Sequence, residues 1–127
     1  MLQKLFRQSV AGYVRRRNEK SNEYCKHRGV DSRKVCYIQA EHIYNILHLE
    51  NETEVSVRCS SADLEKMLEV VGFIRVHRTY IINMAYVDHI KDKTVLVNKR
   101  EIPVSARLKS RLRKEYSRYC RENARYC

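Results

Sequence analysis

Between residues 34 and 105, hydrophobic residues alternate with polar ones in eight short segments, which is the pattern of half-buried β-strands. These segments are rich in Val, Ile, Tyr and Thr, and they are KVCYIQ, IYNILHL, EVSVRCS, FIRVH, TYIIN, VDHIK, TVLVN and EIPVS. They follow one another too closely for the long crossovers that parallel strands need. The pattern therefore predicts antiparallel hairpins, with QAEH (39–42) and NMAY (83–86) as short helical turns that link strands at an angle.

Two amphipathic helices are predicted within and after the strands. The segment SSADLEKMLEVVG begins with Ser60 or Ser61 as the N-cap and ends at Gly72, and its apolar residues recur at helical spacing. We expect it to cover the core. A second helix follows Pro103 with Ser105 as its N-cap, and it is basic as well as amphipathic.

The N-terminal region also has helical periodicity. Residues 2–14 predict an amphipathic basic helix, and this helix could pack on the domain, dimerise, touch an anionic surface or connect to another domain. A polar linker follows it. We therefore divide the chain into a helix and linker (1–33), a domain (34–115) and a basic extension rich in Tyr and Arg (116–127).

The formal charge of the chain is +11, and the excess lies at its two ends. Residues 1–34 hold ten basic and three acidic side chains, and residues 105–127 hold eight and two, whereas residues 35–104 hold eight and ten. This distribution favours an anionic partner. The alternative is that each end is a solvated tail.

The cysteines and the hydropathy indicate the environment. Five cysteines without a CxxC pair argue against a disulfide framework and against a common zinc site, and they fit a reducing cytoplasm. No apolar run approaches the roughly 18–20 residues that a membrane span requires. We expect a soluble, cytoplasmic protein.

Nothing in the chain has the spacing of an enzyme site. Gly12, Gly29 and Gly72 are scattered and form no phosphate-binding loop, and the five histidines stand singly. We therefore expect no catalytic residues, no metal and no cofactor.

Basic side chains stand instead where elements end. In RVHRTY the strand alternation stops at His77 and Arg78, which predicts a tight turn with outward side chains. An exposed arginine can bond guanine O6 and N7 together, although Arg78 could instead pair with a carboxylate such as Asp88. Arg107 follows the IPVS strand end and reaches the same sheet edge if the strands are adjacent.

The ENETE loop (50–54) is a third candidate edge. Its three glutamates suit phosphates poorly, and a solvated hairpin is the alternative. Asn51 and Thr53 could still bond bases or phosphates.

Several motifs together resemble a known family. FIRVHRTYIIN, YVDHI and EIPVSARLKSRL, preceded by YIQAEHIYNI and ADLEKMLEVVGF, resemble the LytTR DNA-binding domain of bacterial transcriptional regulators over residues 34–115. The resemblance implies a mainly β fold, an elongated stack of small antiparallel sheets with one side helix, to which this chain adds basic N- and C-terminal helices. It also implies that loops, and not a recognition helix, bind successive major grooves of duplex DNA.

The resemblance assigns roles to individual residues. The base-contacting positions that it implies are Arg78, Arg107, His77 and Thr53. The positions for phosphate contact or loop support are Asn51, Thr79, Ser105, Lys109 and Arg111. The family's paired direct-repeat sites imply two protomers per site, with the residue 2–14 helix as a candidate homodimer surface.

Two alternatives remain open. One is a basic β-module for RNA, although no aromatic pairs of a stacking platform are evident. The other is a protein-interaction module that modulates a full-length regulator through the N-terminal helix. Family members usually follow a receiver domain, which these 127 residues cannot contain, so we do not expect regulation by phosphorylation.

Overall fold

The computed structural model describes residues 13–16, 24–26 and 30–123. Its strands are β1 (Tyr13–Arg16), β2 (Tyr24–Lys26), β3 (Val35–Glu41), β4 (Tyr44–Leu49), β5 (Glu54–Arg58), β6 (Phe73–His77), β7 (Tyr80–Asn83), β8 (Val87–Ile90), β9 (Thr94–Val97) and β10 (Arg100–Pro103). Its helices are the α-helices α2 (Ser61–Leu68) and α3 (Ala106–Glu122) and the 3-10 turns η1 (Ser32–Lys34), η2 (Glu69–Val71) and η3 (Met84–Tyr86).

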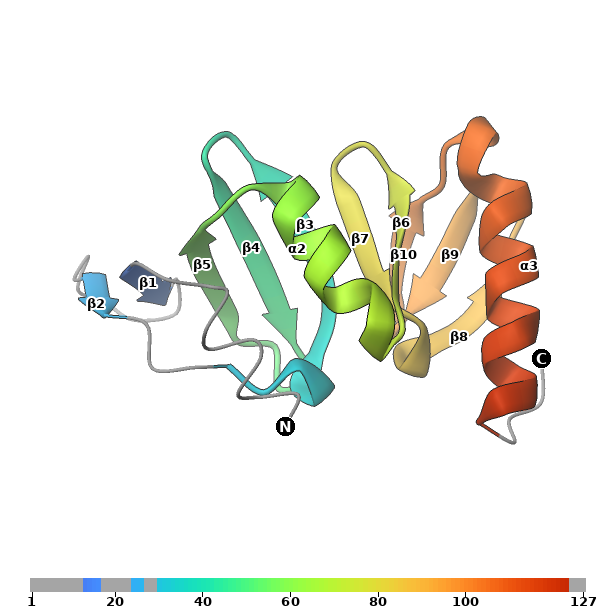
Figure 1. Ribbon diagram of the computed structural model, residues 1–127, viewed down its shortest axis with the longest axis horizontal. Coiled ribbons are helices and arrows are strands. Elements are labelled where there is room, and N and C mark those ends of the chain that lie inside the picture. Colours follow the sequence, from blue (N-terminus) through green and yellow to red (C-terminus); the bar gives the residue numbers. More distant parts are fainter. Residues whose placement is uncertain (1–12, 17–23, 27–29, 124–127) are drawn as a thin grey trace.

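The strands form two antiparallel sheets. One has seven strands in the order β2-β1-β5-β4-β3-β7-β6, and the other has three in the order β10-β9-β8. Helix α2 lies across one face of the larger sheet near the middle of the long axis, and α3 stands beside the smaller sheet at the right-hand end of this axis (Figure 1). The expected mainly β fold with a side helix and a basic C-terminal helix is confirmed.

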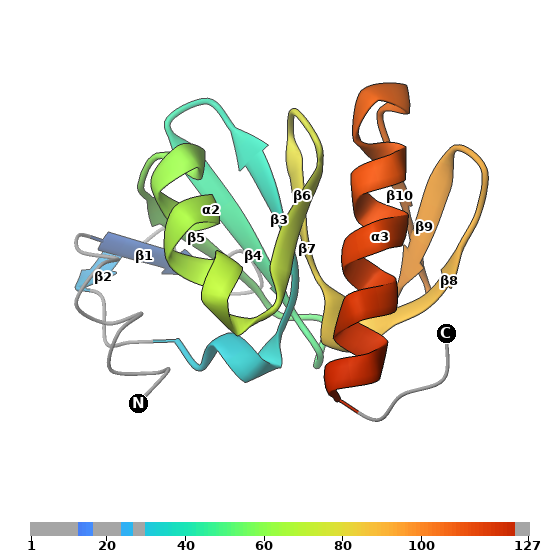
Figure 2. The same cartoon turned by 45° about the vertical axis from the view of Figure 1, so that its right-hand side comes forward.

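Two hydrophobic cores hold these elements together. In the first, Leu64 and Leu68 of α2 pack on sheet residues that include Ile38, Leu47 and Ile81. In the second, Val76 of β6 and Val95 of β9 are buried with residues of α3, namely Leu112, Tyr116 and Cys120. Figure 2 shows α3 in front of β9 and β10, where it closes this second core.

The predicted strands and most turns are confirmed. All eight alternating segments form strands, β3 to β10. Helix α2 begins as expected, because Ser60 Oγ accepts a hydrogen bond from the Asp63 amide at 3.1 Å. The chain leaves this helical region at Gly72, whose φ is +97°. The NMAY turn is η3, where Asn83 Oδ1 accepts from the Ala85 amide at 3.0 Å.

The predicted helical turn at 39–42 is wrong. Gln39, Ala40 and Glu41 continue β3 and pair with β4, and the chain then reverses in a tight turn at His42, whose φ is +55°. These residues have little intrinsic strand preference, so pairing with a distant segment overrides their local tendency.

The N-terminal helix is not supported where it can be checked. Tyr13 and Val14 belong to β1, which pairs with the edge of β5, so the prediction is wrong at these positions. The rest of the predicted helix lies outside the described residues. A strand edge offers unpaired amide and carbonyl groups, and satisfying them outweighs a weak helical period.

One described cysteine forms a disulfide bond, which the cysteine pattern did not predict. Cys120 is disulfide-bonded, whereas Cys36 and Cys59 are free. Burial raises the pKa of the Cys36 thiol to about 11, so this thiol is an inert part of the core. No described helix is long and apolar enough to cross a membrane.

Candidate nucleic-acid interface

The direction of the strands decides which loops lie together. Because neighbouring strands are antiparallel, successive connections alternate between the two ends of the molecule. The segments at one end, uppermost in Figure 1, are 41–43, 78–79, 91–93 and 104–107, and we call this end the loop edge. The segments at the opposite end are 50–53, 84–86 and 98–99.

Backbone hydrogen bonds fasten the loop edge into one unit. They run from Ala40 N to Thr79 O (2.8 Å), from Ser105 N to Val76 O (2.9 Å) and from Val104 N to Lys93 O (2.9 Å). The four segments come from both sheets and from α3. The relative positions of their side chains are therefore set by the fold and not by flexible loops.

The turn after β6 is organised by His77. Its Nδ1 accepts a hydrogen bond from the Thr79 amide at 3.2 Å and lies 3.0 Å from Thr79 Oγ1. An accepting Nδ1 places the proton of the neutral ring on Nε2. The ring also meets Tyr80 edge-on at 5.9 Å. His77 and Thr79 thus hold the turn, which is the supporting role expected for Thr79, whereas His77 was expected to contact bases.

Arg75 braces the same turn from below. Its Nε donates to Glu65 Oε1 on α2 at 2.8 Å, and its Nη1 donates to the Arg78 carbonyl oxygen at 2.7 Å. The Arg75 side chain is only 16% exposed. Of the three basic residues in RVHR, this one is internal, and its fork joins the turn to the helix.

Arg78 itself is exposed at the tip of the turn. Its side chain has no hydrogen-bonding or ionic partner among the described residues. Asp88, the carboxylate proposed as its alternative partner, accepts a hydrogen bond from the Lys99 amide at 2.9 Å near the opposite end. The guanidinium of Arg78 is therefore available to an external ligand.

The start of α3 adds a second arginine. Ser105 is the N-cap residue as expected, but its side chain makes no capping hydrogen bond, and its buried Oγ has no partner among the described residues. Arg107, in the first turn of α3, is exposed. Arg111 is exposed one turn further along. Neither arginine has an ionic partner in the described part of the chain.

Lys109 is engaged within the protein. It forms an ion pair with Asp92 in the 91–93 loop, and this hydrogen bond and charge lower the pKa of the Asp92 carboxyl. Both residues are at the protein surface, so the pair is exchangeable. A phosphate could take Lys109 from Asp92, which keeps Lys109 a candidate contact.

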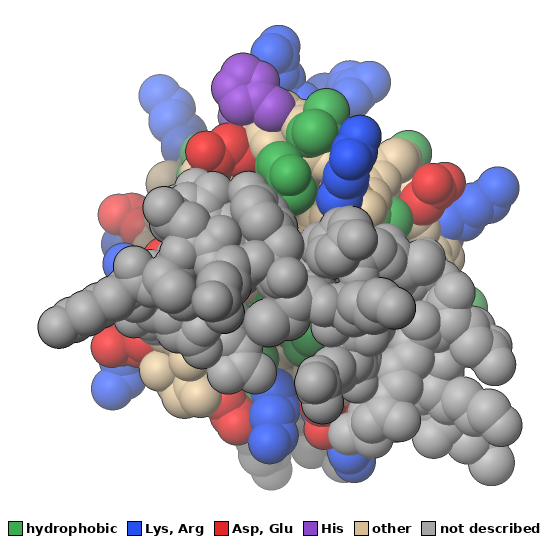
Figure 3. Space-filling model, turned by 90° about the vertical axis from the view of Figure 1, so that its left-hand side faces the viewer, with side chains coloured by type: hydrophobic (Ala, Val, Ile, Leu, Met, Phe, Trp, Pro, Cys, Tyr) green, Lys and Arg blue, Asp and Glu red, His purple; other side chains and the backbone are tan. Residues whose placement is uncertain are grey.

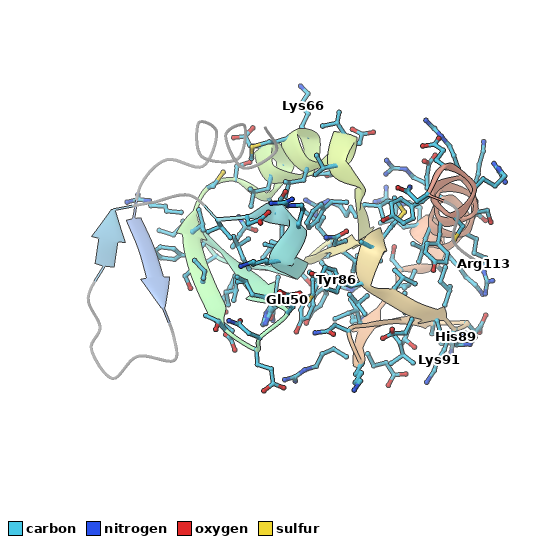
Figure 4. The ribbon with its side chains drawn as sticks, turned by 90° about the horizontal axis from the view of Figure 1, so that it is seen from below. Glu50, Lys66, Tyr86, His89, Lys91 and Arg113 are labelled. Atoms are coloured by element: carbon cyan, nitrogen blue, oxygen red, sulfur yellow. The ribbon has the colours of Figure 1, made fainter. Side chains whose placement is uncertain are left out.

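Asn51 and Thr53 are not brought to the loop edge. Their loop joins β4 to β5 at the opposite end, where Asn51 Oδ1 accepts from the Thr53 amide at 3.1 Å. The preceding residue, Glu50, lies 3.0 Å from the hydroxyl of Tyr86. Figure 4, seen from below, shows Glu50 and Tyr86 together at this end.

The β3–β4 hairpin is the part of the loop edge that sequence reasoning missed. Ile43 is 58% exposed at its tip, beside the strained backbone of His42. Together with Arg58, which is also exposed, they border a surface cavity of about 350 Å³. Counting elements along the chain was the available signal, because β4, β5, the α2 region and β6 lie between the hairpin and the Arg78 turn, and an even number of elements returns the chain to the same end.

The surface agrees with this geometry. Lys and Arg side chains, a histidine and hydrophobic side chains emerge at the upper end of the face in Figure 3, with Asp or Glu side chains beside them. Within the described residues, no group of His, Cys, Asp and Glu is arranged to hold a metal ion. The exposed arginines and lysines of the loop edge suit an extended anionic ligand that presents planar groups with hydrogen-bond acceptors.

Comparison with known proteins decides the family. The sequence profile of the LytTr DNA-binding domain matches residues 26–117, which is most of the chain. The chain belongs to the LytTr DNA-binding domain family. The members of this family are DNA-binding domains.

A solved structure agrees on the fold. A LytTr DNA-binding domain from Bacillus cereus superimposes with a TM-score of 0.62 at 24% sequence identity, covering 84% of this chain and 95% of the other. At this identity the likeness concerns the fold alone. No match was found among curated proteins.

Proposed function

We propose that this LytTr domain is a sequence-specific regulator of transcription that reads the major groove of duplex DNA with its loop edge. One observation carries this proposal: two exposed arginines, Arg78 and Arg107, have no side-chain partner among the described residues and stand on segments joined by the Ser105 to Val76 hydrogen bond. A guanidinium can bond guanine O6 and N7 together, and this contact distinguishes base pairs.

Other residues of the edge have supporting roles in this proposal. His77 and Thr79 keep the turn in shape, with the His77 Nε2 proton facing away from Thr79 as a further donor. Arg111 and Lys109 on α3 contact phosphates, and these contacts provide the salt-dependent part of the affinity. Ile43 on the hairpin offers an apolar surface to a thymine methyl group.

Thr53 and Asn51 are left outside the proposed interface. A B-DNA duplex is a rigid rod at this scale, and a single groove that receives the Arg78 turn cannot also receive a loop at the opposite end of the β-strands. Paired direct repeats, two protomers per site and action in the bacterial cytoplasm belong to the same proposal.

The test is duplex selection from a random library at near-physiological salt, with the wild type and Arg78→Ala in parallel. We expect the wild type to enrich a motif and Arg78→Ala to relax one position in it. Arg121→Ala changes an exposed arginine near the C-terminal end of α3, far from the loop edge, so it is the matched control and should enrich the wild-type motif. Binding that only tracks ionic strength, with no enriched motif, would exclude direct readout.

Single-stranded RNA is the second ligand to include in this test. A basic β-module for RNA would prefer it to duplex DNA. The described aromatic contacts, such as the stacked pair of Tyr37 and His48 at 4.2 Å, involve largely buried or internal rings and provide no open stacking platform. We therefore expect duplex DNA to compete better.

A further inference from the structure

A groove lies at the end of the molecule away from the loop edge. It has a volume of about 490 Å³ and runs between η2 and the C-terminal half of α3. Val70 on its rim is 78% exposed, an unusual position for a large apolar side chain, and Tyr119 and Met84 line its floor. DNA on the loop edge would not cover this surface.

The rim of the groove is acidic. Glu69, Glu115 and Glu122 line it, and the single lining arginine, Arg118, pairs with two of them, at 2.9 Å to Glu122 and 3.8 Å to Glu115. Among the described residues that line the groove, three carboxylates and one guanidinium leave an excess of negative charge, in a chain whose formal charge is +11. The groove is thus apolar inside and acidic outside, which suits a basic amphipathic segment.

The chain itself contains such a segment. Residues 2–10, which are outside the described part, carry Leu2, Leu5, Phe6 and Val10 at helical spacing together with two cations. The cations are Lys4 and Arg7. Apolar residues matched to Val70 and cations matched to the glutamates make this segment complementary to the groove.

The topology decides which copy provides the segment. The groove lies next to β6, because η2 directly precedes this strand in the chain. Strand β1 begins at Tyr13, and five inter-strand distances in the sheet separate β1 from β6. At about 4.8 Å each, these spacings amount to about 24 Å. Val10 can lie at most about 11 Å from Tyr13, because three Cα steps of about 3.8 Å separate them. Val10 therefore cannot enter the groove of its own chain, so a segment that binds with Val10 in the groove belongs to another copy.

We propose that the groove between η2 and α3 receives residues 2–10 of a second copy of this chain. The contact is head-to-tail, so it joins two different surfaces of the two protomers and does not impose a two-fold axis on them. Direct-repeat sites present their halves in one orientation, and this association would serve two protomers on such a site. The inference goes beyond the proposed function and does not depend on it, because it concerns association without DNA.

The test is sedimentation equilibrium of the full chain in the absence of DNA. One variant reverses the groove (Glu69→Lys with Glu122→Lys), a second reverses the segment (Lys4→Glu with Arg7→Glu), and a third combines all four changes. The control, Asp92→Lys with Glu101→Lys, makes the same change in net charge outside the groove. We expect each two-site variant to associate at least tenfold more weakly, the four-site variant to recover wild-type association, and the control to match the wild type.

Recovery in the four-site variant also shows that the altered chains fold. A wild type that stays monomeric at every concentration overturns the inference. So does a control that loses association as strongly as the groove variant, since general charge repulsion would then be the cause. Four changes that fail to restore association likewise overturn it, because the two surfaces would not be partners.

Discussion

The Ser105 amide donates a hydrogen bond to the Val76 carbonyl oxygen at 2.9 Å, and this bond joins the start of α3 to the end of β6. Arg107 follows Ser105 by two residues, and Arg78 follows Val76 by two. The two arginines therefore project from adjacent backbone segments that cannot move independently. A pair of guanidinium groups fixed in this way can address neighbouring positions of one groove.

This relationship predicts the effect of Arg107→Ala. We expect it to relax discrimination at a base pair other than the one that Arg78→Ala relaxes, with each change costing about 1–3 kcal/mol at its own position. Competition binding with singly substituted duplexes measures both effects. Loss of affinity that is uniform across all sequences would identify Arg107 as a phosphate contact instead.

The 50–53 loop at the opposite end should not contribute to DNA binding. Asn51→Ala and Thr53→Ala should each leave the dissociation constant for a specific duplex within about twofold, a change of about 0.4 kcal/mol. Asn51→Ala should still lower the free energy of unfolding by about 1 kcal/mol, because its Oδ1 accepts the Thr53 amide hydrogen bond. A base-specific loss in Thr53→Ala would restore the role that the family resemblance implied for it.

Much of this fold is local in origin, which is why it could be predicted. The alternation in segments such as FIRVH marks strands, and Ser60 and Gly72 mark the two ends of the α2 region, because caps and pleats depend on nearby residues. The turn of β3 into β4 could not be predicted, since Gln39 and Glu41 become strand residues only by pairing with β4.

The candidate site divides in the same way. The exposed Arg78 turn was predictable because strand alternation stops there. The internal role of Arg75 was not, because its partners, Glu65 and the Arg78 carbonyl oxygen, depend on where α2 packs. Placing residues 50–54 at an edge with Arg78 required the strand directions, which the sequence motifs alone do not specify.

Gly72 is required by its conformation and by its neighbour. Its φ is +97°, and a Cβ built there would lie 3.3 Å from Tyr119 Cε2. Gly72→Ala should lower the free energy of unfolding by about 1–2 kcal/mol, measured by urea denaturation. Adding Tyr119→Ala to this variant separates the two causes. If the cost of Gly72→Ala is unchanged in the Tyr119→Ala background, the cost is due to the backbone alone.

Tyr86 predicts a dependence of stability on alkaline pH. Its hydroxyl lies 2.5 Å from the Arg33 carbonyl oxygen and 3.0 Å from Glu50 Oε2, so it must stay protonated to donate. Burial, followed by the neighbouring Glu50, raises the pKa of Tyr86 to about 12. A raised pKa means that the folded state holds this proton more tightly than the unfolded state, whose tyrosine titrates near its ordinary value of about 10.

The stabilisation by Tyr86 is therefore complete below pH of about 10 and is lost as the pH rises toward about 12. Tyr86→Phe should be less stable than the wild type by about 1 kcal/mol at neutral pH, and the difference should shrink across this interval. Comparing the two proteins at each pH removes the contribution of the other tyrosines and lysines. A difference that stays constant with pH would contradict the proposed proton donation.

Arg75 gives the most direct test that the loop edge works as a rigid unit. Its guanidinium joins Glu65 on α2 to the Arg78 carbonyl oxygen, and it is too internal to contact DNA. Arg75→Lys keeps the charge but cannot make both hydrogen bonds in a planar fork. We expect it to weaken binding to a specific duplex and to relax discrimination at the base position read by Arg78, because the turn loses the two hydrogen bonds that hold it.

The salt dependence of binding should not change, since no phosphate contact is removed. Glu65→Gln is the matched control, because its amide oxygen can still accept from Arg75 and should preserve most of the discrimination. A decrease of about 0.9 in the slope of log affinity against log salt concentration for Arg75→Lys would instead place Arg75 on a phosphate, and the turn would then not need this brace.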